Sequence, residues 1–111
     1  MDSLVDYRAT IAETLNEYTK IPYAYGNIQC RLIISEDRNH FLLISQGWED
    51  DLQVHGCLVH LEIINDKIWI HRDGIEDGIA NDLLRAGIAK NRIVLGFHPP
   101  EVRPYTEFAV S

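Results

Sequence analysis

The chain has 111 residues, of which 46% are apolar and 24% charged, and this balance excludes a disordered or low-complexity protein. Its length suits a single domain over residues 1–111. The 17 acidic and 10 basic residues give a net charge of −7, with the basic residues scattered along the sequence, so direct binding to nucleic acid is not expected.

The first residues, MDSLVDYRATIAETL, lack the basic and apolar regions of a signal peptide. No apolar run approaches the roughly 20 residues that a membrane helix needs. We therefore expect a cytoplasmic protein with no membrane contact. Cys30 and Cys57 both lie in apolar runs, and in the cytoplasm they are expected to be reduced and packed as small apolar side chains.

An amphipathic helix is predicted over Ser3–Thr19. Its apolar residues recur every three or four positions, at Leu4, Tyr7, Ile11, Leu15 and Tyr18. Pro22 ends this helix, because the residue before a proline avoids helical backbone. The segment IPYAYGN is predicted to be a loop with exposed tyrosines.

Four strands are predicted next, from alternating apolar and polar residues. The first two, Ile28–Ile34 and His40–Gln46, flank the polar turn SEDRN, and the wider loop GWEDDLQ follows them. Strands at Val54–Ile64 and Lys67–Arg72 then flank Asn65-Asp66. Asn and Asp tolerate the positive φ of a tight hairpin turn, so this last pair is expected to be a hairpin.

A second helix is predicted over Asp73–Ala86, with Gly87 at its C-terminal cap. Asp73 is expected to be the N-cap and Glu76 to complete a capping box. One helical turn, a short strand at Ile93–Phe97 and a proline-rich tail packed on the body of the domain are expected to follow.

These elements predict an α+β fold, an antiparallel sheet of about four to five strands with the N-terminal helix and the second helix packed on one face. The other face is expected to carry apolar residues beside polar ones, namely Ile33, Leu43, Leu58 and Trp69. If that face is open, it is apolar enough to be an association surface.

The triplet His71-Arg72-Asp73 has the order found in a protein-kinase catalytic loop. That loop also needs an Asn five residues after the Asp, and here the position is Gly78. The sequence has no glycine-rich phosphate loop and no Asp-Phe-Gly motif. A structural role for the triplet, as the end of a strand and the start of a helix, is therefore favoured over catalysis.

The segment HGCLVH places zinc-type donors close together at His55, Cys57 and His60, with His71 on the next strand. Regular strand alternation would put His55 and Cys57 on one face and His60 on the other. We therefore expect neither a metal site nor a cofactor. A small metal-assisted nuclease or hydrolase using His55, His60 and His71 remains the alternative.

Long segments of the sequence, VHGCLVHLEIINDKIWIHRDG and IVLGFHPPEVRPYTEFAV together with IPYAYG and GIANDLLRAGI, resemble the XisI family of fdxN-element excision controlling factors from cyanobacteria. The resemblance spans nearly the whole chain, with Ile75 standing where a small hydroxyl residue is expected. It implies an accessory role beside XisH and the recombinase XisF in removing a DNA element during heterocyst differentiation. It implies no catalytic residue.

The expected function is therefore that of a non-catalytic factor that controls site-specific DNA excision by binding a XisH-like partner, with an indirect link to a recombinase. An acidic protein of this kind suits a basic, DNA-handling partner. Trp and Arg are enriched at binding hot spots, which makes Trp48, Trp69, Arg72 and Arg103 the candidate interface residues. A homodimer through the outer face or the edge of the sheet is also expected.

Overall fold

The computed structural model describes residues 3–21 and 27–111, with the side chains described from Tyr7 onward. Residues 22–26, which include the predicted loop tyrosines, lie outside the described part. The described elements in chain order are α1 (Ser3–Thr19), β1 (Asn27–Ile34), β2 (His40–Glu49), β3 (Leu52–Ile64), β4 (Lys67–Asp73), α2 (Ile79–Arg85), the 3-10 turn η1 (Lys90–Arg92), β5 (Ile93–Leu95) and the 3-10 turn η2 (Arg103–Tyr105).

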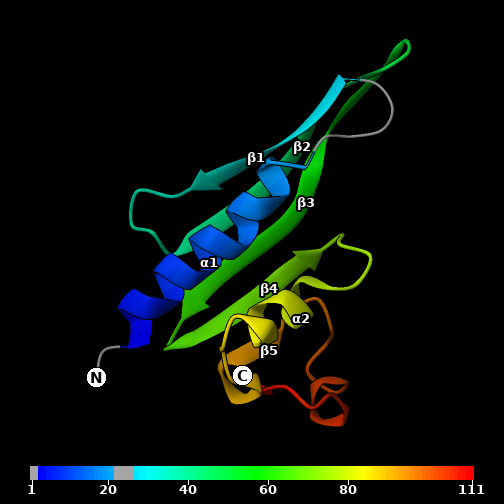
Figure 1. Cartoon of the computed structure of the whole chain (residues 1–111). Coiled ribbons are helices and arrows are strands. Elements are labelled where there is room, and N and C mark those ends of the chain that lie inside the picture. Colours follow the sequence, from blue (N-terminus) through cyan, green and yellow to red (C-terminus); the bar gives the residue numbers. More distant parts are fainter. Residues whose placement is uncertain (1–2, 22–26) are drawn as a thin grey trace.

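The strands form one sheet in the order β1-β2-β3-β4-β5 (Figure 1). The first four are antiparallel neighbours, as predicted, but β5 runs parallel to β4, with Ile68 opposite Ile93. The reason is that α2 lies between these two strands in sequence, so the chain crosses back before it re-enters the sheet. The α+β class is confirmed, with a sheet that is mixed at one edge.

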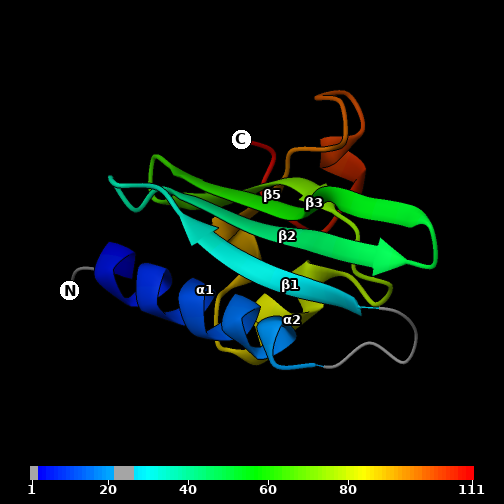
Figure 2. The same ribbon diagram turned by 90° about the horizontal axis from the view of Figure 1, so that it is seen from above.

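Both helices cover one face of the sheet, and the C-terminal segment lies on the other face (Figure 2). The helix α1 buries Ile11 and Leu15 completely, in keeping with its predicted apolar stripe. Beneath the helices the strands contribute fully buried residues at alternate positions, namely Phe41, Leu43, Val59, Leu61, Ile68 and Ile70. The core therefore lies between the helices and one face of the sheet.

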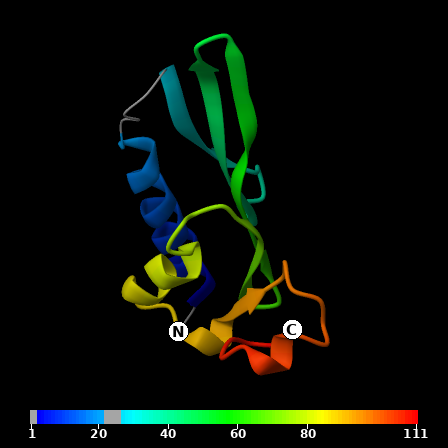
Figure 3. The ribbon, with the colours of Figure 1, turned by 90° about the vertical axis from the view of Figure 1, so that its right-hand side faces the viewer.

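Two tight hairpin turns join β2, β3 and β4. Asn65 and Asp66 have φ values of 50° and 65°, which confirms the predicted primed turn. The predicted loop GWEDDLQ is wrong, because β2 continues to Glu49 and β3 begins at Leu52. The β2–β3 hairpin therefore forms a long arm that extends beyond the helices (Figure 3).

Gly47 allows the start of β1 to pair closely with β2 along this arm. Its φ is 147°, and a Cβ at this position would lie 1.8 Å from the backbone oxygen of Asn27. A glycine is needed here because no side chain fits between the two strands.

The second helix begins later than predicted, at Ile79 instead of Asp73. Asp73 is the last residue of β4, and its two carboxylate oxygens accept hydrogen bonds from the backbone amides of Ile75, at 3.1 Å, and Ile79, at 2.9 Å. The predicted capping box with Glu76 is therefore wrong, since Asp73 reaches the start of the helix across an intervening turn. Gly87, with φ of 103°, ends the helix as predicted.

The predicted tail packs on the body of the domain. Strand β5 is shorter than predicted, ending at Leu95, but Ala109 returns to pair with Val94 and donates its amide to the Ile93 oxygen at 2.9 Å. Phe108 packs against the buried core. Within residues 3–21 and 27–111, no helix is long and apolar enough to cross a membrane.

Two β-bulges shift the alternation of the strands. In β3, Val59 lies opposite Leu43 and Cys57 opposite Ile44, so Leu58 is an extra residue. In β4, His71 is extra in the same way, between Ile70 and Arg72. The predicted outer positions of Leu43 and Leu58 are therefore wrong. Leu43 is fully buried in the core, and Leu58 lines a pocket on the side of the helices.

Candidate functional site

The face of the sheet turned away from the helices is the first candidate site, and we call it the outer face. Its positions alternate with the buried residues of β1 to β4. They are Gln29, Arg31 and Ile33 of β1, His40, Leu42, Ile44, Gln46 and Trp48 of β2, His55, Cys57, His60 and Glu62 of β3, and Lys67, Trp69, His71 and Arg72 of β4.

Three histidines from three neighbouring strands meet around Glu62 on this face. His71 Nε2 lies 2.9 Å from Glu62 Oε1, and His40 Nε2 lies 3.3 Å from Glu62 Oε2. His40 Nδ1 lies 3.1 Å from His60 Nε2. The rings of His60 and His71 are 5.0 Å apart. We call these four residues the histidine cluster.

The hydrogen bonds of the cluster are satisfied when all three imidazoles are neutral. With the protons of His40 and His71 on Nε2, both rings donate to the Glu62 carboxylate, and His40 Nδ1 can accept from His60. Burial lowers the pKa of His60, and the neighbouring rings of His71 and His40 lower it further, while Glu62 opposes them. The cluster therefore disfavours the second proton that would make His60 positively charged.

His55 lies apart from this cluster. The bulge at Leu58 places His60 on the same face as His55 and Cys57, so the expectation of opposite faces is wrong. Five residues still separate His55 from His60, roughly 16 Å along a strand. The structure therefore does not bring His55, His60 and His71 together. In the described part of the chain, no group of three or more His, Cys, Asp or Glu is arranged to hold a metal ion.

Trp69 is half-buried beneath the C-terminal segment. The guanidinium of Arg103 lies 4.9 Å from the centre of the Trp69 ring, within the range of a cation–π contact. Arg103 Nε also donates a hydrogen bond to the His98 backbone oxygen at 3.0 Å. A Cβ at Gly96 would lie 3.0 Å from Trp69 Cε3, so the chain passes close to the ring. Trp69 and Arg103 thus form one connected unit.

The two remaining predicted interface residues also belong to the outer face. Arg72 Nε donates to the Cys57 backbone oxygen at 2.8 Å and pairs in register with His60 of the histidine cluster. Trp48 lies near the tip of the β2–β3 arm and is 53% exposed. Eight residues of β2 separate it from His40, roughly 25 Å. The predicted residues therefore share one face, with Trp48 at its far end.

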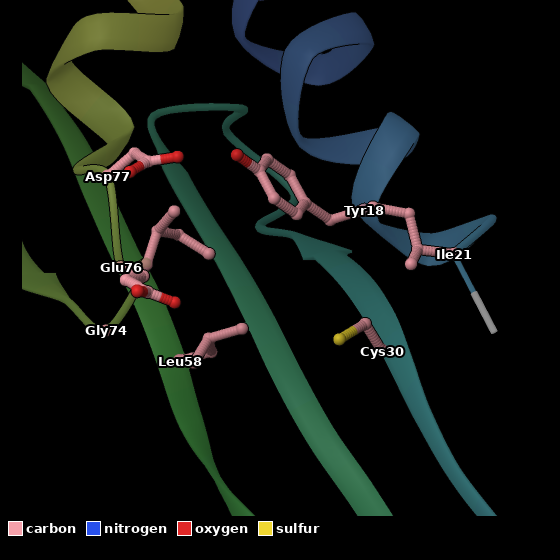
Figure 4. A pocket seen from close by; sticks show the side chains of 8 residues that line it. Tyr18, Ile21, Cys30, Leu58, Gly74, Glu76 and Asp77 are labelled. Atoms are coloured by element: carbon pink, nitrogen blue, oxygen red, sulfur yellow. The ribbon is translucent and has the colours of Figure 1, made fainter. Parts of the chain in front are cut away.

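A pocket of about 370 Å³ opens on the side of the helices (Figure 4). It is bounded by the end of α1, by β1, by the bulge in β3 and by the segment that follows β4, through Tyr18, Ile21, Cys30, Leu58, Gly74, Ile75, Glu76 and Asp77. Its floor is apolar, and Glu76 and Asp77 place carboxylates at its rim. This arrangement suits an apolar group that carries a positive charge.

Tyr18 closes one side of the pocket through a hydrogen bond that its hydroxyl donates to Asp82 of α2. Burial, the hydrogen bond to Asp82 and the charge of Asp82 raise the pKa of Tyr18 to about 12. Arg85 pairs with the other oxygen of the Asp82 carboxylate. These contacts join the two helices at the rim.

The family model for the XisI protein matches residues 1–110. The chain belongs to the XisI family. No curated protein sequence matches it significantly.

Two solved structures from Anabaena variabilis ATCC 29413 are similar to this XisI-family chain over nearly their whole length. A protein described as XisI-like has a TM-score of 0.86 and 28% identity, with 97% of this chain and 99% of that chain covered. A protein described as fdxN element excision controlling factor XisI has a TM-score of 0.80 and 38% identity, with 99% and 100% covered. The accessory role expected from the sequence resemblance is therefore supported by family and fold together.

Proposed function

We propose that this chain is a non-catalytic, cytoplasmic accessory factor that controls the excision of a DNA element of the fdxN type during heterocyst differentiation in a cyanobacterium. It acts by binding a XisH-like protein, and its link to the site-specific recombinase is indirect. Family membership supports the controlling role, since a relative 38% identical is described as an excision controlling factor.

The observation that carries the binding role is the outer face. Except for the C-terminal segment over Trp69, no described element packs on this face. It gathers exposed and half-buried aliphatic side chains, two tryptophans and three arginines, counting Arg103 over Trp69. An open sheet face with aromatic and arginine side chains has the composition of a protein interface.

The binding role is tested by co-expressing the chain with the XisH-like protein of the same genome. We expect the two proteins to co-purify and to form a complex at micromolar concentration in calorimetry. The Trp48→Ala and Trp69→Ala variants should weaken it. Separate elution of the two wild-type proteins at micromolar concentration would refute the proposal.

The alternative, a metal-assisted nuclease or hydrolase, required His55, His60 and His71 in one site. His55 lies too far along β3 to bind the same metal ion as His60 and His71, so the geometry favours a binding role over metal-assisted cleavage. Elemental analysis of the purified protein and a cleavage assay with added zinc or manganese separate the two functions. Bound metal together with metal-dependent cleavage would favour the enzyme.

We also propose that the chain forms a homodimer through the edge strand β1 or the outer face. Strand β1 pairs with β2 alone among the described strands, and Ile33 and Ile34 are exposed along it. Such an edge can pair with a second copy. Light scattering after gel filtration should give the mass of a dimer, and a monomeric mass would contradict this proposal.

A further inference from the structure

The charges of the chain are unevenly placed. Its net charge is −7, yet the outer face carries basic side chains at Arg31, Lys67 and Arg72, joined by Arg103 over Trp69. Glu62 is the one carboxylate among the outer-face positions, and both of its oxygens are occupied by His40 and His71. Strand register thus brings Arg31, Lys67 and Arg72 to one side of the sheet, and the C-terminal segment adds Arg103.

These four cations lack acidic partners. The described ion pairs of lysine and arginine join Lys20 to Glu17, Arg85 to Asp82 and Lys90 to Glu107, and none of them involves one of these four cations. No described carboxylate forms an ion pair with any of the four. Because these four charges lie on one side of the sheet and have no described carboxylate to neutralise them, they form a surface that favours an anionic ligand.

Two of the arginines are held in position by the backbone. Arg72 Nε donates to the Cys57 oxygen and Arg103 Nε donates to the His98 oxygen, at 2.8 Å and 3.0 Å. In each side chain the outer guanidinium nitrogens have no described acceptor. A guanidinium fixed at Nε presents its remaining donors in a defined plane, which suits recognition of a carboxylate by two parallel hydrogen bonds.

The centre of the face, between Arg31 and Arg72, is aliphatic. In register across the strands, Ile33 lies beside Leu42, and Ile44 lies between Arg31 and Cys57. Ile33 is 50% exposed. A ligand that fills this face therefore needs apolar side chains as well as negative charges.

We propose that the outer face binds an acidic segment of the partner protein in which carboxylates alternate with aliphatic side chains. The carboxylates pair with Arg31, Arg72 and Arg103, and the aliphatic side chains cover Leu42 and Ile44. This inference rests on the proposed function and specifies the chemistry of the contact. It places an acidic partner segment on the sheet, where the net charge alone had suggested a basic one.

Other occupants fit the face less well. The outer face of a second copy would bring unpaired cations against cations, so a homodimer is better built through the edge of β1. Single-stranded nucleic acid stacks its bases on exposed aromatic rings. Here the centre is aliphatic, Trp69 is covered by Arg103, and the exposed Trp48 stands alone at the far end of the face among the described tryptophans.

The test compares two double variants that change the net charge equally. Arg31→Gln with Arg72→Gln removes charge from the outer face, and Lys20→Gln with Arg85→Gln removes it on the side of the helices. In calorimetric titrations with the XisH-like protein, the outer-face pair should weaken binding about tenfold or more and reduce its salt dependence. The control pair should bind within about twofold of the wild type. Urea unfolding of each variant verifies that it is folded.

The outcomes separate this inference from the proposed function. If the wild-type proteins form no complex, the proposed function fails. If they do, but the outer-face pair binds with unchanged affinity and salt dependence, only the acidic-segment inference is overturned. A single-stranded oligonucleotide could also displace the partner from the wild-type chain and fail to bind the Arg31→Gln, Arg72→Gln variant. That result would overturn the inference in favour of nucleic acid as the ligand.

Discussion

The two faces of the sheet are made by the same strands, yet they differ in almost every physical property. The face beneath the helices consists of fully buried apolar side chains such as Phe41 and Leu61, and no described polar or charged residue is buried. The outer face alternates with it residue by residue and carries histidines, cations and exposed aliphatic groups. We infer that one face provides stability and that the other is available for recognition.

The largest expected effect is on stability, and it is measured by comparing two neighbouring residues of β2 that lie on opposite faces of the sheet. Phe41→Ala removes a fully buried ring and should lower the free energy of unfolding by about 3–5 kcal/mol. Leu42→Ala, on the outer face, should cost about 1 kcal/mol or less because its side chain is already partly in water. Urea unfolding at several protein concentrations measures both. Equal losses would mean that a second copy or another element covers the outer face in solution.

The next effect concerns binding. Arg103→Ala removes the guanidinium over Trp69 and should weaken the proposed complex with a XisH-like protein by about 2 kcal/mol, as for a hot-spot arginine. The free energy of unfolding should change less, by about 1 kcal/mol, because this cation–π contact is only partly shielded from water. Calorimetry gives the affinity, and Arg85→Ala on α2 is the control. A loss in the control as large as that in Arg103→Ala would locate the contact on the side of the helices.

A smaller effect lies on the side of the helices. Tyr18→Phe removes the hydrogen bond to Asp82 and should cost about 1 kcal/mol. Because the folded protein raises the pKa of Tyr18 from 10.0 to about 12, its stabilisation is complete below pH 10 and is lost as the pH rises towards 12. Absorbance titration of the phenolate follows this ionisation directly. Tyr105→Phe, at an 89% exposed position, should change neither the free energy of unfolding nor the ionisation of Tyr18.

The smallest effect probes the histidine cluster. The folded state lowers the pKa of His60 below its ordinary 6.5, so the unfolded chain binds the proton more readily. Stability attributable to His60 is therefore complete above pH 6.5 and declines as the pH falls below it. Between pH 7.5 and 5.5, the temperature of thermal unfolding should fall less steeply with decreasing pH for His60→Gln than for the wild type. The exposed His55→Gln should leave the slope unchanged, and an identical slope in both variants would contradict the role of the cluster.

Local patterns in the sequence predicted most of the fold. The α1 stripe, the Asn65-Asp66 turn and the glycine after α2 depend on nearest neighbours along the chain, and all three were predicted correctly. The two bulges were not predictable, because an extra residue such as Leu58 or His71 is tolerated only where the opposite strand accommodates it. The long-range cap from Asp73 to Ile79 was missed for a similar reason, since it requires the intervening turn.

The candidate site was predictable only in part. Trp69, Arg72 and Arg103 were selected by residue type, and the structure places them on one face near each other. His40 was missed because its position opposite Glu62 depends on the bulge at Leu58, which shifts the register between β2 and β3. Arg31 was missed because its significance depends on the absence of a nearby acid in space. Charges scattered in the sequence form this surface through the strand register and the path of the C-terminal segment.

The bulges at Leu58 and His71 have a consequence for how this family varies in length. Each is one residue more than regular pairing needs, so its deletion would leave Cys57 and Val59, or Ile70 and Arg72, on their present faces. Deletion of a neighbour such as Leu42 would instead invert every residue that follows in the strand. Relatives one residue shorter within the sheet are therefore expected to have their alignment gaps at these two positions and to keep the remaining residues on their present faces.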